Sequence, residues 1–202
     1  MFSRLTTYLH EMESKSPELP DHRKGKLKKL AEFVRTSETA RLIFICTHNS
    51  RRSQLCQVWS QAIAHYFELE NMEAYSGGTE VTAFHPHAIA ALRRAGFQID
   101  NPGGENPRCA VFYAEEAPPV QCFSKTYDHD ENPRQDFAAV MTCSEADEDC
   151  PYVPGATLRV SLPYKDPKES DGTAEQEQVY DERCRQIASE MFYMVQQCGK
   201  AT

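Results

Sequence analysis

The stretch RLIFICTHNSRRS, residues 41–53, joins an apolar run to a polar, basic loop. The run at 41–45 is rich in residues that favour strands, which predicts a buried strand. An amphipathic stretch at 53–69 follows the loop and predicts a helix. We therefore expect a strand, a short loop and a helix in direct succession, with the loop at the carboxyl end of the strand.

The loop carries the pattern Cys-x5-Arg-Ser, which runs from Cys46 to Ser53. A loop that curls from a strand into a helix turns successive backbone N–H groups inward, and the helix dipole adds positive potential at the same point. Arg52 would add a planar fork of donors suited to a tetrahedral oxyanion. We predict an oxyanion-binding loop made of Thr47, His48, Asn49, Ser50, Arg51 and Arg52.

Cys46 is the candidate nucleophile of this loop. The positive potential favours its thiolate, which is the reactive form of a cysteine. Ser53 could cap the helix and also hydrogen-bond the sulfur, stabilising it as a leaving group. The competing interpretation is a buried cysteine before a capped helix, and the position directly after a buried strand favours the functional one.

Strand and helix patterns alternate along the rest of the chain. Three further apolar runs predict strands, at 72–76, 137–141 and 157–162. Two further amphipathic stretches predict helices, at 86–95 and 174–197. Because strands that alternate with helices pair in parallel, we expect an α/β fold with a four-stranded parallel sheet and helices on both faces.

Two segments do not follow this alternation. Residues 1–39 have apolar positions at helical spacing and predict a helical N-terminal extension to a domain at 40–202, with the basic run at 23–29 as a solvated helix face. Residues 101–135 hold five prolines and two β-like runs, at 109–113 and 120–127. They predict an inserted hairpin across which Cys109 and Cys122 could face each other.

Composition limits the partners and the compartment. A formal net charge of −8 argues against non-specific binding to nucleic acid. No segment approaches about 18 consecutive apolar residues, and the first residues lack the apolar core of an export signal. We expect a cytoplasmic protein with no membrane partner, in which the eight cysteines are reduced.

At residues 46–53 the chain resembles the low-molecular-weight tyrosine phosphatase family, and specifically its thioredoxin-coupled arsenate reductase branch. The resemblance covers about residues 41–198 and implies the same α/β fold. His48 departs from the glycine that is common at its position, and it could bring a further cation to the substrate or merely tolerate the backbone geometry. Arg51 stands where a cysteine or another small residue is usual, and we interpret it as a surface charge.

The resemblance also implies a general acid. Family members keep an Asp-Pro pair after the last strand, which Asp166 and Pro167 match. An acid at this place would protonate the departing oxygen while Cys46 attacks. The competing interpretation is a simple turn, in which Asp-Pro is common. The tyrosines that follow this pair in the phosphatases are replaced here by residues 168–170, Lys-Glu-Ser.

Residues 140–151 look like the redox segment of the arsenate reductases. Cys143 and Cys150 flank an acidic stretch, 145–149, that should raise the pKa of nearby thiols. The resemblance implies that Cys143 attacks the adduct on Cys46 and that Cys150 then takes over the disulfide. A zinc site at this spacing is weakly supported, and two packed thiols are the remaining alternative.

The resemblance implies one candidate ion. Ser76 and Asn49 match residues of a potassium site in arsenate reductases, but Gln57 stands where an acidic ligand is expected. We expect no other cofactor and no other metal.

Three functions are compatible with these patterns. The first is an arsenate reductase with thioredoxin as its reductant. The second is a phosphatase that hydrolyses phosphotyrosine or small phosphate esters through a phosphocysteine. The third is a noncatalytic oxyanion-binding or redox-sensing module. The presence of the candidate general acid Asp166 argues against this third function.

Overall fold

A computed structural model describes residues 1–14, 18–149 and 152–199 of the chain. Its helices are α1 (Ser3–Ser14), α2 (Asp21–Thr36), α3 (Arg52–Tyr66), α4 (Pro86–Ala95), α5 (Ser144–Asp149), the 3-10 helix η1 (Pro167–Ser170) and α6 (Gln176–Cys198). Its strands are β1 (Ala40–Cys46), β2 (Met72–Gly78), β3 (Gln98–Asp100), β4 (Cys109–Phe112), β5 (Val120–Cys122), β6 (Phe137–Met141) and β7 (Ala156–Ser161). No helix in the described ranges is long and apolar enough to span a membrane.

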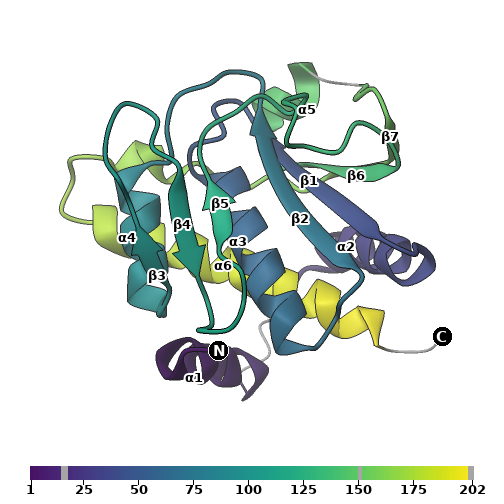
Figure 1. The fold of residues 1–202 in the computed structure, drawn as a ribbon, viewed down its shortest axis with the longest axis horizontal. Helices are drawn as coiled ribbons and strands as arrows, with labels where there is room; N and C mark the ends of the chain where they lie inside the picture. Colours follow the sequence, from purple (N-terminus) through teal and green to yellow (C-terminus); the bar gives the residue numbers. More distant parts are fainter. Residues whose placement is uncertain (15–17, 150–151, 200–202) are drawn as a thin grey trace.

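The predicted four-stranded parallel sheet is confirmed. Its order is β2-β1-β6-β7, and Figure 1 shows these strands to the right of the smaller sheet. β1 is central and pairs along its whole length with β2, from Ala40 opposite Met72 to Cys46 opposite Gly78. Because all four strands are parallel, the loops that follow β1, β6 and β7 emerge at the same edge of the sheet.

β1 is apolar from Leu42 to Cys46 because both faces of the sheet are covered there, although unequally. Leu42 and Phe44 belong to the large core under α2, α3 and α6. Ile43 and Ile45 belong to a smaller cluster on the other face, which the short helix α5 covers. A strand buried on both faces has no polar alternation, which explains the unbroken apolar run at 42–45.

The helices α1 and α2 of the predicted extension are part of the large core. Leu5 and Leu9 of α1 and Leu27 and Leu30 of α2 are fully buried. Burying a leucine side chain completely contributes roughly 1.5–3 kcal/mol. α1 lies beneath the smaller sheet in Figure 1 and contacts α4.

The interpretation of residues 23–29 as a solvated helix face is correct for some positions and wrong for one. Lys28 and Lys29 are exposed. Arg23 is instead mostly buried, with a side chain that is 12% exposed, because it pairs with Glu190 of α6.

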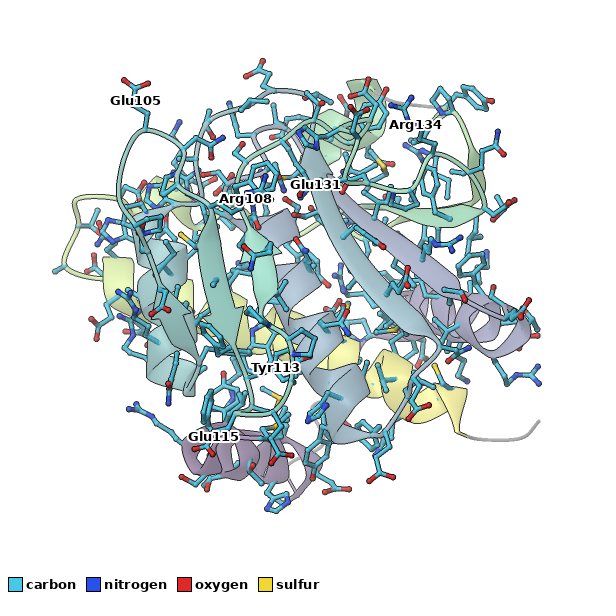
Figure 2. All side chains as sticks on the ribbon, viewed as in Figure 1. Glu105, Arg108, Tyr113, Glu115, Glu131 and Arg134 are labelled. Carbon is cyan, nitrogen blue, oxygen red and sulfur yellow. The ribbon has the colours of Figure 1, made fainter. Side chains whose placement is uncertain are left out.

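The predicted hairpin is confirmed within residues 101–135. β4 and β5 are antiparallel and place Cys109 opposite Cys122, and β3 adds a third strand in the order β3-β4-β5. Figure 2 shows Arg108 and Glu131 close together, where they form an ion pair at 2.8 Å that ties the start of the segment to its end. β5 ends at Cys122, earlier than expected, because the residues after it bind the loop that follows β1.

Candidate active site

The loop after β1, residues 46–53, is called the oxyanion loop below. Five of its backbone carbonyls, at residues 46–50, accept hydrogen bonds from surrounding segments. These bonds are Thr79 N–H to Cys46 (3.3 Å), Glu80 N–H to Thr47 (2.8 Å), Ser124 Oγ to His48 (2.8 Å), Gln54 Nε2 to Asn49 (3.1 Å) and His85 N–H to Ser50 (2.9 Å). Within the described ranges, no backbone N–H of residues 47–51 donates to another protein group. The carbonyls of the loop are thus bonded to the surrounding segments, while the N–H groups of residues 47–51 have no acceptor among the described residues. This is the arrangement by which a concave stretch of backbone binds an anion.

Asn49 and Gly78 allow this tight path. Asn49 has a φ of 45°, in the left-handed region that asparagine tolerates better than most residues. Gly78 passes so close to the loop that a Cβ there would lie 2.6 Å from Thr47 O and 2.8 Å from Asn49 N. Any larger residue at Gly78 would push the loop backbone out of place.

Cys46 ends β1 and is nearly buried. Its sulfur lies 3.1 Å from Ser53 Oγ, as expected. Ser53 Oγ also accepts a hydrogen bond from Asn49 Nδ2 at 2.9 Å, which leaves its own proton to point at the sulfur. The expectation that Ser53 caps the helix is wrong, because α3 already begins at Arg52 and Ser53 lies in its first turn.

Arg52 connects the oxyanion loop to residues 162–166, which follow β7 and are called the acid loop below. Its Nη1 donates to Tyr164 O at 3.1 Å and its Nη2 to Asp166 Oδ2 at 2.6 Å. Its Nε is buried and has no partner among the described residues, so it remains available to a bound oxyanion.

Asp166 lies in a turn and is also held at the oxyanion loop. Its Oδ1 accepts a hydrogen bond from the backbone N–H of Lys168 at 3.0 Å and so caps η1, as a turn residue would. Its Oδ2 is held at the oxyanion loop by Arg52. The carboxyl group is therefore fixed at the place where an acid could reach an oxyanion.

The interpretation of Arg51 as a surface charge is wrong. Its side chain is 11% exposed, with Nε donating to Tyr180 Oη at 2.9 Å and Nη2 lying 3.4 Å from Asp171. His85 stacks on Tyr180, and burial together with the Arg51 charge lowers its pKa to about 4. These contacts lock the end of the oxyanion loop to α6, whereas the side chain of His48 is only half-buried and lies 3.3 Å from Glu80.

Cys143 follows β6 and is fully buried beside the oxyanion loop. Its sulfur lies 3.6 Å from Thr47 Oγ1 and accepts a hydrogen bond from Ala146 N–H at 3.3 Å. Burial raises the pKa of Cys143, and these two contacts partly oppose that effect. The predicted increase of this pKa is confirmed, but its largest cause is burial rather than the acidic stretch, in which Asp147 is bound to Arg159 at 2.6 Å. Cys150 lies outside the described residues.

The residues of the candidate potassium site do not fit that ion. Asn49 Oδ1 already accepts hydrogen bonds from Lys125 N–H and from Gln54 Nε2. Ser76 Oγ donates to Gln57 Oε1 at 2.6 Å, so no carboxylate joins the set. Lys125 is 4% exposed and lines the same cavity as Gln57, of about 320 Å³, which places a protein cation nearby. No cluster of His, Cys, Asp and Glu that could hold a metal occurs in the part of the chain that the structure describes.

Comparisons with known proteins agree with this geometry. The family model described as low molecular weight phosphotyrosine protein phosphatase matches residues 41–105. Arsenate reductase 2 of Staphylococcus saprophyticus subsp. saprophyticus is 30% identical over 128 residues, which cover 62% of this chain and 77% of the relative. The arsenate reductase of Bacillus licheniformis is 26% identical over 159 residues, or 79% and 96% of the two chains.

A solved structure supports the fold. The low molecular weight phosphotyrosine phosphatase from Vibrio cholerae O395 aligns with a TM-score of 0.53 at 15% sequence identity, over 78% of this chain and 95% of that one. Together with the sequence matches, this shows that the chain belongs to the low molecular weight phosphotyrosine protein phosphatase family, in which these two sequence relatives are arsenate reductases.

Proposed function

We propose that this protein reduces arsenate to arsenite through an intramolecular thiol cascade. The observation that carries the proposal is the second thiol, Cys143, whose sulfur lies 3.6 Å from Thr47 Oγ1 on the loop of Cys46. A hydrolase of this family needs only the first thiol, whereas a reductase must supply two electrons and consumes thiols in sequence. Arsenate reductases among the sequence relatives support the same assignment.

In the first step arsenate binds to the free N–H groups of the oxyanion loop and to Arg52 Nε. The Cys46 thiolate attacks arsenic, an As–O bond breaks, and Asp166 protonates the departing oxygen, which leaves as water. Arsenic remains in the +5 state in the resulting S–As adduct. The Ser53 hydroxyl stabilises the Cys46 sulfur whenever it carries negative charge.

In the second step the Cys143 thiolate attacks the Cys46 sulfur. The S–As bond breaks and its electron pair stays on arsenic, so arsenite leaves in the +3 state and a Cys46–Cys143 disulfide forms. Cys150 then attacks Cys143, which releases the Cys46 thiolate and leaves a Cys143–Cys150 disulfide. A dithiol protein, for which we propose thioredoxin, reduces that disulfide and returns the two electrons.

This series of thiol reactions requires helix α5 to unwind. Its six residues lie between the two cysteines, and a helix of that length spans roughly 9 Å. Cα atoms joined by a disulfide lie only about 4.4–6.8 Å apart. A cascade of reduced thiols also needs a reducing compartment, so we place the protein in the cytoplasm.

Hydrolysis of phosphate esters is the second candidate, because Cys46, Arg52 and Asp166 are the same groups that a phosphocysteine mechanism needs. Phosphate and arsenate have the same charge and nearly the same shape. η1, rather than an aromatic platform, follows Asp166, so nothing in that segment stacks on a phenyl ring.

Arsenate added to the reduced protein distinguishes the two functions. We expect a Cys143–Cys150 disulfide by peptide mass mapping, accumulation of a Cys46–Cys143 disulfide in Cys150→Ser, and no disulfide in Cys143→Ser. Both variants should keep the hydrolysis of 4-nitrophenyl phosphate that the wild type shows. If thioredoxin, its reductase and NADPH support no arsenate-dependent NADPH oxidation while phosphate esters turn over regardless of Cys143, the phosphatase function replaces the reductase.

A further inference from the structure

Arg23, in the first turn of α2, makes a buried ion pair with Glu190 of α6. Its Nε and Nη2 donate to the two carboxylate oxygens at 2.6 and 2.7 Å. Glu190 is fully buried, and the Arg23 side chain is 12% exposed. Such a bidentate pair holds both groups in one orientation, because the fork of the guanidinium matches the carboxylate.

The same guanidinium binds the acid loop. Its Nη1 donates to Pro163 O at 3.0 Å, and its Cζ lies 4.9 Å from the ring centroid of Tyr164. The Tyr164 hydroxyl donates to Glu190 at 2.9 Å, so the ring is held at both its face and its end. Arg23 and Glu190 therefore restrain residues 163 and 164 through backbone and side chain together.

Tyr164 connects Arg23 and Glu190 to Arg52 of the oxyanion loop. Its backbone carbonyl accepts the hydrogen bond from Arg52 Nη1 at 3.1 Å, while Asp166, two residues later, accepts from Arg52 Nη2. One continuous set of contacts thus runs from α2 through the acid loop to the guanidinium that faces the oxyanion. Each link in it is a direct hydrogen bond or ring contact.

The position of Arg23 is set by packing that does not involve the site. Leu27, Leu30 and Val34 of α2 are fully buried in the large core, against α6 and the sheet. α2 also precedes residues 41–105, to which the family model applies. The support therefore comes from a part of the chain outside the matched region.

We propose that Arg23 is a positioning residue, through which the N-terminal helix α2 holds the acid loop and its Asp166 against the oxyanion loop. The proposal rests on the acid role of Asp166 in the proposed function, but not on which oxyanion the protein turns over. A mispositioned acid slows the reaction most when the leaving group depends on protonation. Aryl phosphates with poor and good leaving groups therefore reveal its position.

The test compares kcat/KM for phenyl phosphate and 4-nitrophenyl phosphate in the full-length protein. Arg23→Lys keeps a charge beside Glu190 but loses the fork that also binds Pro163 O. We expect kcat/KM for phenyl phosphate to fall about 10-fold, that for 4-nitrophenyl phosphate to fall less than about 3-fold, and the inhibition constant of phosphate to stay within about 2-fold. Lys24→Met, one residue away on the surface, should change none of these values.

A second variant covers the case in which Arg23→Lys does not fold. Arg23→Met combined with Glu190→Gln removes both charges, keeps an acceptor for the Tyr164 hydroxyl, and should show the same selective loss. Equal losses for the two esters, or no loss for either, would overturn the positioning role. If the wild type hydrolyses neither ester, the rate of arsenate-dependent NADPH oxidation with thioredoxin and its reductase replaces the ester kinetics, and equal rates in the wild type and the two variants would overturn the positioning role. Whether the wild type shows that oxidation at all tests the proposed function separately.

Discussion

Arg52 Nη2 donates a 2.6 Å hydrogen bond to Asp166 Oδ2, and this bond joins the oxyanion loop to the acid loop. Since Arg52 Nη1 is also bound, to Tyr164 O, the guanidinium is oriented before any oxyanion arrives. Its remaining buried donor, Nε, can then donate a hydrogen bond to the ligand without any reorganisation of the side chain. Preorganised donors of this kind supply much of the stabilisation of a developing oxyanion.

Arg52→Lys should lower kcat/KM for 4-nitrophenyl phosphate by about 100-fold or more. An ammonium cannot contact Tyr164 O, Asp166 and an oxyanion at once, because it lacks the planar fork. Steady-state kinetics of the folded variant measure the effect. A variant within a few-fold of the wild type would show that the fork is not needed.

Asp166→Asn should slow the first chemical step by roughly 100-fold to 10,000-fold, the usual contribution of a positioned general acid. The amide oxygen can still accept from Arg52, so the affinity for phosphate should hardly change. Single-turnover kinetics and phosphate inhibition measure the two quantities. Asp171→Asn is the control, because Asp171 is engaged by Tyr180 and Arg51. If Asp171→Asn shows the larger loss instead, the acid is Asp171.

Iodoacetamide at pH 6 should alkylate Cys46 before any other cysteine, and phosphate should protect it. Cys46 lies at the base of the loop with the free N–H groups and its sulfur hydrogen-bonds Ser53 Oγ, whereas Cys56, Cys122 and Cys184 are fully buried thiols whose pKa values are raised by burial. Ser53→Ala should slow the modification several-fold. Peptide mapping identifies the site, and faster labelling elsewhere without phosphate protection would contradict the assignment of the loop.

Potassium should not activate the enzyme over sodium at equal ionic strength. The oxygens of Asn49 and Ser76 are already engaged by protein groups, and Lys125 brings a fixed cation to the same region. Initial rates in KCl and NaCl should agree within about 2-fold. Several-fold activation by potassium would mean that these hydrogen bonds open to admit the ion.

His85 should make the protein less stable in mild acid. Burial lowers its pKa to about 4 in the folded state, while the unfolded chain binds a proton near pH 6.5. The unfolded state therefore takes up more protons as the pH falls from 6.5 towards 4, and the stabilisation is lost in that window. Urea unfolding should show that the wild type loses about 1–2 kcal/mol more than His85→Gln between pH 7 and pH 5. Equal losses in the two proteins would assign the acid sensitivity to other groups.

The strands and the parallel sheet could be predicted because their signals are local: an apolar run, a turn and an amphipathic helix follow one another along the chain. The same holds for the oxyanion loop, whose eight residues are contiguous. The burial of Arg51 could not be predicted, since its partners Tyr180 and Asp171 lie more than a hundred residues away. Nor did any pattern indicate that Ser124 and Lys125, from the inserted segment, bind the oxyanion loop, at the His48 carbonyl and the Asn49 side chain.

Residues 41–53 were sufficient to predict a nucleophile at Cys46 and an anion-binding backbone after it, because strand propensity, loop length and helix periodicity act over a few residues. The orientation of Arg52 and Asp166 depends on contacts between distant parts of the chain, which no local pattern encodes. Arg23 and Glu190, which restrain the acid loop, are 167 residues apart and meet only when α2 and α6 pack on the same face of the sheet. One short segment therefore determines the nucleophile and the loop that follows it, whereas the alignment of Asp166 with them depends on the packed core.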